Sequence, residues 1–464
     1  MERGCLALVV TLHHRFPGVG QAVGADWACA AADCYWPLLQ AIDHAASQGR
    51  AHVITLAVSP SWTALASDPA AQALTRIELE RRVRATGHEP WGEHWREILR
   101  FAVDRSQLDA VSVLRRAADS GTAELIPSPA SWTWLPSLAT SPLLLRAQVG
   151  LAAADHSRVF GHKPQGFWTP MLGSPIGLER TLATYGLRFY AADAFAFRRG
   201  TVAPPAAVLG PLITTPGVAA FGVENHAARK LDGPQRYAND PRYRDFRAGS
   251  AAAEEHADDF LRRWVEESRT IRDRVGSHRE PSPPISIQEL PASRLGGSWA
   301  FGARWLSRVL DRLGSQPPSD WRPLTLSHYI DRFPSGPLGR PGHALGHWWA
   351  DHPQASVMSD RCRVAADALA DVLAQRGTLT ERGLRALAQM IRSLLLAQAC
   401  DWESPPGFEL SAQQGLSRNE GRFDQFVELS ASLAAGHLAS DRLVLAEAGP
   451  AFLPEIDFRL LDAV

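Results

Sequence analysis

Four residues that could contact a ligand stand at or just after short apolar runs of the sequence. They are His13, Trp132, Trp168 and Asp193. Histidine and aspartate can hydrogen-bond to hydroxyl groups, and the flat ring of tryptophan can stack on the face of a sugar. Barrels of parallel strands place their sites at the C-terminal ends of the strands. The spacing therefore predicts a ligand site at one end of such a barrel.

The elements that would position these residues alternate between strands and helices. Residues 53–58 and 187–193 are mostly apolar, which is typical of strands buried on both faces of a parallel sheet. Helical spacing of apolar residues fills the intervening segments, including residues 70–120 and 143–160. We therefore predict an α/β barrel over residues 1–334. Further predicted strands lie at residues 5–12, 124–127, 284–289 and 322–326.

Two parts of the chain depart from this alternation. Residues from about 197 to 253 are rich in Pro, Gly and Arg and predict an irregular insertion over the barrel mouth. Residues 335–464 contain helical patterns and no strand signal, which indicates a separate C-terminal helical domain packed on the barrel. Its predicted helices span residues 359–376, 380–400 and 417–436.

Composition excludes several classes of function. The 48 Lys and Arg residues balance 49 Asp and Glu residues, so we expect no basic surface for nucleic acid or an anionic membrane. No apolar run reaches the length of a membrane span, and the first one ends in His13 rather than in a small-residue cleavage site. Five cysteines without Cys-x-x-Cys spacing predict neither a disulfide framework nor a zinc site, and they fit the reducing cytoplasm.

The order of short motifs along the chain resembles glycoside hydrolase family 57, and within it the 1,4-α-glucan branching enzymes. The motifs are His13-x-Arg15-x-Pro17, Val58-Ser59-Pro60, Leu125-Ile126-x-Ser128, Gly166-Phe167-Trp168-x-Pro170, Phe189-Tyr190-x-x-Asp193, Tyr243-Arg244-Asp245-Phe246 and Ala399-Cys400-Asp401-Trp402. The resemblance covers nearly the whole chain. It implies an incomplete TIM-like (β/α)7 barrel with a C-terminal α-helical domain. It also implies an α-glucan, such as glycogen or a maltooligosaccharide, as the ligand, and neither a metal nor another cofactor.

The resemblance is weakest at the residues that carry the family's chemistry. Family members act on α-glucan chains with retention, which requires a carboxylate nucleophile and a carboxylic acid about 5 Å apart. The family pattern places the nucleophile where this chain has Met171, whose thioether is unsuited to holding a glycosyl intermediate. The acid aligns with Pro291 when counted back from Trp299 and with Glu289 when counted forward from the predicted strand. Glu289 is the one carboxylate that we assign to catalysis.

The resemblance also predicts six substrate-binding residues: His13, Trp132, Trp168, Asp193, Asp401 and Trp402. Five of these six residues, all except Asp193, also have a structural interpretation. His13 could be a hydrogen-bonded structural histidine, Trp132 and Trp168 could pack in the core, and the Asp401-Trp402 pair could serve to end a helix. Histidines of the family pattern are replaced here by Arg15, Trp132 and Phe195.

Three functions follow as hypotheses. The first is a branching-enzyme-like protein that binds glucan, or a glucan enzyme, and has lost most of its catalytic power. The second is an active retaining transferase or hydrolase with relocated carboxylates, for example Glu289 with Asp193, or Asp193 with Asp240. The third is a scaffold without glucan affinity that docks a partner glucan enzyme through its helical domain.

Overall fold

Seven parallel strands surround a filled interior in this chain. We describe it from a computed structural model, which covers residues 3–87, 90–201, 206–224, 237–275, 282–297, 299–342, 353–401, 412–436 and 440–462. The strands in these ranges are β1 (Gly4–Leu12), β2 (Ile54–Val58), β3 (Ala123–Pro127), β4 (Gly166–Phe167), β5 (Phe189–Asp193), β6 (Leu212–Ile213), β7 (Ala219–Val223), β8 (Ile285–Pro291) and β9 (Trp321–Pro323).

Two hydrogen-bonded sheets make up the ring. One has the order β3-β2-β1-β8, with β9 also paired to β1, and the other has the order β4-β5-β7-β6. Every pairing is parallel except that of β6 with β7. Trp168 N donates to Pro127 O at 2.9 Å, and Gln288 Nε2 donates to Glu224 O at 2.8 Å. These two bonds join the sheets at both seams and close an incomplete (β/α)7 barrel.

Side-chain alternation along the strands separates an inner core from an outer one. On β1, Cys5, Ala7 and Val9 pack inside the barrel, and the neighbouring Leu6, Leu8 and Val10 pack outward against helices. These inward side chains of β1 are small, so aromatic rings from other elements fill the barrel interior. The aromatic residues of this inner cluster are Trp168, Phe189, Phe221 and Tyr329. The barrel is therefore a packed core, and a ligand can reach it only at the strand ends.

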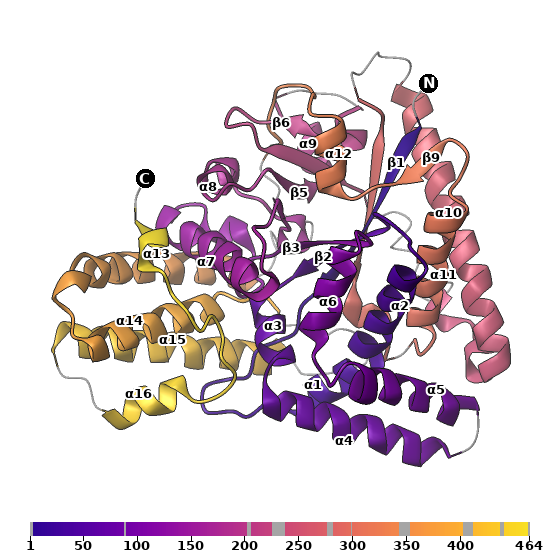
Figure 1. Cartoon of the computed structure of the whole chain (residues 1–464). Helices are drawn as coiled ribbons and strands as arrows, with labels where there is room; N and C mark the ends of the chain where they lie inside the picture. The colour runs from indigo at the N-terminus through magenta and orange to yellow at the C-terminus, as the bar shows by residue number, and fades with distance from the viewer. Residues whose placement is uncertain are drawn as a thin grey trace.

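Helices cover the outside of the ring (Figure 1). The barrel helices are α1 (Ala25–Ala30), α2 (Trp36–Ser47), α3 (Pro60–Ala66), α4 (Pro69–Thr86), α5 (Pro90–Leu99), α6 (Ala110–Asp119), α7 (Pro142–Phe160), α8 (Leu178–Thr184), α9 (Ala194–Arg198), α10 (Phe246–Val275), α11 (Gly302–Ser315) and α12 (Leu326–Arg332). Local sequence sets several of their starts. Ser59 caps α3 by accepting from Trp62 N, and Asp68 caps α4 by accepting from Ala71 N.

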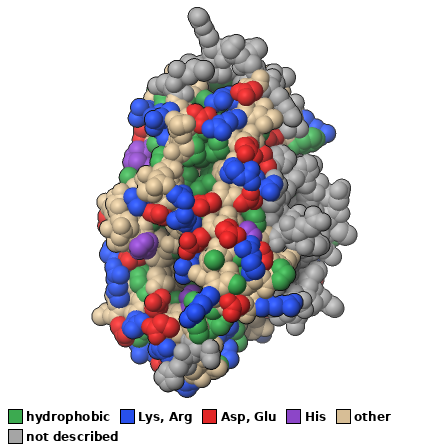
Figure 2. All heavy atoms as spheres, turned by 90° about the vertical axis from the view of Figure 1, so that its right-hand side faces the viewer, with side chains coloured by type: hydrophobic (Ala, Val, Ile, Leu, Met, Phe, Trp, Pro, Cys, Tyr) green, Lys and Arg blue, Asp and Glu red, His purple; other side chains and the backbone are tan. Residues whose placement is uncertain are grey.

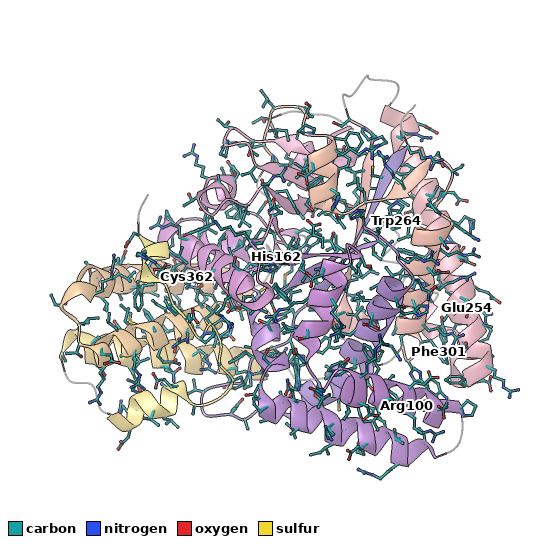
Figure 3. All side chains as sticks on the ribbon, viewed as in Figure 1. Arg100, His162, Glu254, Trp264, Phe301 and Cys362 are labelled. Carbon is teal, nitrogen blue, oxygen red and sulfur yellow. The ribbon has the colours of Figure 1, made fainter. Side chains whose placement is uncertain are left out.

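The described part of the C-terminal region contains four α-helices: α13 (Pro353–Ala374), α14 (Glu381–Ala397), α15 (Ala412–Ala434) and α16 (Ser440–Glu447). They lie on one side of the barrel (Figure 1). Cys362 of α13, labelled in Figure 3, packs in one core with Leu387 of α14 and with Leu145 of α7. The helical region therefore shares apolar surface with the barrel.

The opposite side of the molecule carries mixed charge. Figure 2 shows basic and acidic side chains interleaved over this face. Ion pairs join α10 to α11, including Arg304 with Glu254 at 2.9 Å and Arg312 with Asp258 at 2.9 Å. Beneath them Trp264, labelled in Figure 3, donates from Nε1 to Ser286 Oγ of β8 at 2.9 Å. Among the described residues, no helix combines the length and the hydropathy that crossing a bilayer requires.

The α/β prediction is confirmed, and two of its details need correction. Residues 197–253 were expected to be an irregular insertion, yet they contain β7, which pairs in parallel with β5 as a barrel strand. The strand predicted at 322–326 was expected to close the barrel. Instead β9 pairs with the first residues of β1, and β7 meets β8 at the closing seam. Strand β7 is rich in small residues, which weakened its signal in the sequence.

Substitution of Trp168 tests whether the barrel interior is a packed core. Its side chain is 1% exposed within the inner core, so replacement with alanine should lower the free energy of unfolding by about 3–5 kcal/mol. Phe195→Ala is the control, because Phe195 is 40% exposed, and it should cost less than about 1 kcal/mol. Denaturant unfolding measures both. Equal losses of unfolding free energy in the two variants would contradict the burial of Trp168 in the inner core.

Candidate functional site

His13 lies at the mouth of the barrel, directly beyond the end of β1. Its Nδ1 is 3.2 Å from both Ser59 Oγ and Ser61 Oγ, which follow β2. Its ring stacks on Trp132, which follows β3, with the ring centroids 4.7 Å apart and the planes 9° apart. The ends of three adjacent strands thus converge on one imidazole.

Asp401 approaches the same histidine from the C-terminal region. Its Oδ2 is 2.9 Å from His13 Nε2, and Arg15 donates to its backbone oxygen from Nε at 2.8 Å. The backbone N of Cys400 donates to Trp132 O at 3.2 Å. An isolated bridge also pairs Thr133 with Ala399. The segment after α14 is therefore bound to the barrel mouth by backbone and side-chain contacts.

Burial and pairing set the charge states of this pair. Burial lowers the pKa of His13 below its ordinary value, and the hydrogen bond to Asp401 only partly opposes that shift. Burial alone would raise the pKa of Asp401, but the hydrogen bond from His13 and the nearby positive charges hold it below its ordinary value. A neutral His13 with its proton on Nε2 satisfies both observations. It then donates to Asp401 and accepts at Nδ1 from a serine hydroxyl.

Little space remains beside this pair. A cavity of about 20 Å³ is lined by His13, Arg15 and Asp401 together with Arg418 and Arg422 of α15. That volume accommodates about one water molecule. A larger cleft of about 830 Å³ adjoins it, and its lining includes His14, Arg15, Trp27, Arg418 and, beyond β8, Gly297. The cavity beside His13 and Asp401 is therefore too small for a sugar ring.

Met171 follows β4 in a strained turn. Its φ of 53° and that of Leu172, 57°, lie in the left-handed region, which non-glycine residues rarely adopt. The preceding residues are tied to both neighbouring strands: Trp168 N donates to Pro127 O, and Thr169 Oγ1 donates to Ala191 O at 2.5 Å. Such strained backbone persists where the surrounding structure holds it and is frequent at functional sites. The half-buried Met171 side chain carries no group that can act as a nucleophile.

Glu289 lies on the inward side of β8. It pairs in register with Val9, and Thr11 Oγ1 donates to its Oε1 at 3.3 Å. Alternation places Glu289 on the same face as Ile285 and Ile287, which belong to the inner core. Pro291 is the last residue of the strand on that face. Glu289 thus lies one inward position deeper than Pro291, and its assignment to catalysis stays a prediction.

The other predicted residues differ in their surroundings. Asp193 ends β5, and its carboxylate caps α9 by accepting from Phe195 N at 2.9 Å. Trp168 packs in the inner core, which is its structural alternative. Trp402 lies outside the described residues. The structure therefore brings together His13, Trp132 and Asp401 of the six predicted substrate-binding residues, and contact of any of them with a sugar stays a prediction.

Sequence reasoning missed several polar residues of the mouth. Ser61 is 1% exposed beside His13, and Arg418 and Arg422 reach the mouth from α15. The Ser59-Pro60 turn was recognised, but its role in holding the His13 ring was not. No sequence signal connected Arg418 and Arg422 with the first strand about 400 residues earlier. In the described part of the chain, no cluster of three or more His, Cys, Asp or Glu residues could hold a metal ion.

Comparisons with known proteins agree with this architecture. The family model "1,4-alpha-glucan branching enzyme, C-terminal" matches residues 362–461. A probable 1,4-alpha-glucan branching enzyme of Mycobacterium tuberculosis (strain CDC 1551 / Oshkosh) is 25% identical over 91% of this chain and 90% of its own length.

Solved structures share the fold over the whole chain. The alpha-amylase AmyC of Thermotoga maritima superposes with a TM-score of 0.84 at 20% identity, covering 100% of both chains. A family 57 branching enzyme from Thermococcus kodakaraensis, solved in complex with glucose and additives, superposes with a TM-score of 0.80 at 20% identity. That match covers 99% of this chain and 96% of the other.

The fold is that of the (β/α)7-barrel enzymes of glycoside hydrolase family 57. Within this class, the similarity of the sequence and of the C-terminal region is to the 1,4-α-glucan branching enzymes. The resemblance inferred from the motifs is thereby confirmed.

The burial of His13 predicts how stability responds to pH. The folded-state pKa of His13 lies below its ordinary value of 6.5, so the unfolded chain binds this proton more readily. Stability from a neutral His13 should be complete above pH 6.5 and decline below it, by at most about 1.4 kcal/mol per pH unit. Denaturant unfolding between pH 7 and pH 5 should show a smaller decline for His13→Gln than for the unaltered protein. Parallel curves for His13→Gln and the unaltered protein would disprove the prediction.

Proposed function

We propose that this chain is a branching-enzyme-like protein of α-glucan metabolism that binds glucan at the barrel mouth and is impaired in catalysis. The main observation behind this proposal is the presence of Met171 after β4. It stands after β4, where the family pattern has its carboxylate nucleophile, and the strained turn that presents it is intact. A retaining mechanism needs two carboxyl groups about 5 Å apart across the glycosidic bond. The side chain of Met171 supplies none.

The second carboxyl group is also altered. Pro291 occupies the end of the inward face of β8, and the nearest carboxylate on that face is Glu289, one inward position deeper. A carboxyl group displaced along the strand is poorly placed to protonate the leaving oxygen, because catalysis is sensitive to displacements of about 1 Å. Both chemical steps of a retaining transferase are therefore weakened.

Support for glucan binding comes from the mouth itself. The cleft of about 830 Å³ is large enough for sugar rings, and its lining includes the polar side chains Gln21 and Asp26. The Thermococcus branching enzyme with this fold was solved with glucose. We propose that the cleft binds part of an α-glucan chain, with glycogen or a maltooligosaccharide as the ligand.

A second candidate function rests on Glu289. This carboxylate faces the barrel interior, and Asp193 lies at the end of β5. An active transferase or hydrolase would use Glu289 with a relocated partner. The other pair considered, Asp193 with Asp240, is less suitable, because the Asp240 carboxylate accepts from the backbone N of Arg242 at 2.9 Å and pairs with the Arg242 guanidinium at 2.8 Å.

Restoring the nucleophile tests the proposal. The unaltered protein incubated with amylose should form few α-1,6 branches, and Met171→Glu should form them at least about 100-fold faster, a barrier change of ~2.7 kcal/mol. Branches are counted after debranching by the distribution of released chain lengths. Met171→Gln is the matched control, since it has similar size and no carboxylate. Abundant branching by the unaltered protein would contradict the impairment.

Retention on glycogen beads measures binding in the same samples. The unaltered protein and both Met171 variants should be retained and should be released by free maltooligosaccharide. Absence of retention, with correct folding shown by circular dichroism, would favour the scaffold that docks a partner glucan enzyme.

Glu289→Gln separates the two candidate functions. If the protein is impaired as proposed, this substitution should leave any trace turnover of maltooligosaccharides within about twofold, because a group that stabilises no transition state contributes nothing to the rate. A loss of 100-fold or more, measured by release of reducing ends, would instead establish Glu289 as a catalytic residue. Gln288→Glu is unsuitable as a control because Gln288 Nε2 closes a barrel seam, so Asp331→Asn on the exposed surface serves instead.

A further inference from the structure

Trp132 covers one face of the His13 ring at the barrel mouth. The two rings lie 9° from parallel, with their centroids 4.7 Å apart. The edges of the imidazole are engaged as well, because Nδ1 contacts Ser59 and Ser61, and Nε2 contacts Asp401. The His13 side chain is 13% exposed. The histidine after β1 is therefore enclosed, and the indole of Trp132 closes one of its flat sides.

The backbone of Trp132 is held in a conformation that bulky residues rarely adopt. Its φ of 58° lies in the left-handed region. Trp132 O accepts from the backbone N of Cys400 at 3.2 Å and from Cys400 Sγ at 2.8 Å. Trp132 N donates to Pro129 O at 3.2 Å. Hydrogen bonds at both backbone groups therefore hold the strained turn that directs the indole over His13.

Apolar side chains from two neighbouring loops cover the inner core at the mouth. Trp132 after β3 and Leu172 after β4 are both partly buried, and both pack against the inner cluster that contains Trp168. The cavity beside His13 and Asp401 measures about 20 Å³, which is room for about one water molecule. A pyranose ring therefore cannot lie against His13 while the indole stays in place.

The space that the indole fills has the features of a sugar position. An indole and a pyranose ring are comparable in width, and sugars stack on flat rings as the indole stacks on His13. Ser61 and Asp401 border the same imidazole, and their oxygens can accept hydrogen bonds from sugar hydroxyls. The family pattern has a histidine where this chain has Trp132. The larger ring therefore fills space that the smaller residue would leave open.

We propose that Trp132 is a specificity-determining residue that closes an inner sugar position over His13, so that α-glucan binds in the outer cleft alone. The inner sugar position is the space that the indole fills, and the outer cleft is the hollow of about 830 Å³ lined by Gln21 and Asp26. The ligand in this inference rests on the proposed function. The closure explains how the mouth can bind a glucan chain without taking a glucosyl unit against His13.

Calorimetric titration of the full chain with glucose and with maltoheptaose tests the closure. Trp132→Gly removes the ring, and glycine adopts a φ of 58° without strain. This variant should bind glucose at least about tenfold more tightly than the unaltered protein, because it uncovers a concave site with polar groups. Trp132→Phe keeps a flat ring over His13, so its glucose affinity should stay within about twofold of that of the unaltered protein.

Phe333→Ala is the control for loosening of the inner core. Phe333 is another partly buried ring packed against the inner cluster. Its ring centroid lies 5.5 Å from Arg322 Cζ, and Arg322 pairs with Cys5 at the start of β1, at the end of the barrel opposite His13. Phe333→Ala should therefore leave glucose affinity unchanged. Thermal unfolding shows that each variant is folded, and Trp132→Asn, which is small and tolerates positive φ, provides a second open variant.

The outcomes separate this inference from the proposed function. Unchanged or weaker glucose binding by folded Trp132→Gly and Trp132→Asn would overturn the closure, and weaker binding would show that sugar stacks on Trp132. An equal gain in Phe333→Ala would also overturn it. Failure of the unaltered protein to bind maltoheptaose would contradict the proposed function, while a gain of glucose binding in Trp132→Gly would still support the closure.

Discussion

The barrel mouth depends on the burial of one carboxylate. Asp401 is held by His13 and, at its backbone oxygen, by Arg15, and both partners come from the loop after β1. A buried carboxylate is tolerated only where charges and hydrogen bonds compensate it. The contacts of Asp401 with His13 and Arg15 therefore hold the segment after α14 against the strand ends. In this arrangement Trp132 stacks on the His13 ring, and only a small cavity remains between the barrel and α15.

The β4 turn is held without the side chain of Met171. Hydrogen bonds from Trp168 and Thr169 to the flanking strands fix the turn, and none of these bonds uses that side chain. The backbone at this position therefore does not depend on the side chain that it presents. This independence is the physical reason why the turn can form with methionine where the family pattern has a carboxylate.

The sequence by itself determined the alternation of strands and helices and the replacement at Met171, because periodicity and motif order are local properties. It did not reveal β7, whose small residues resemble a loop, or the inward position of Glu289, and it left core packing and sugar contact as alternatives for Trp168. Only the tertiary structure decided that Asp401 meets His13 across 388 positions of sequence and that Arg418 and Arg422 lie beside Arg15. Contacts between distant segments depend on how the helical region packs against the barrel, and no local pattern records that geometry.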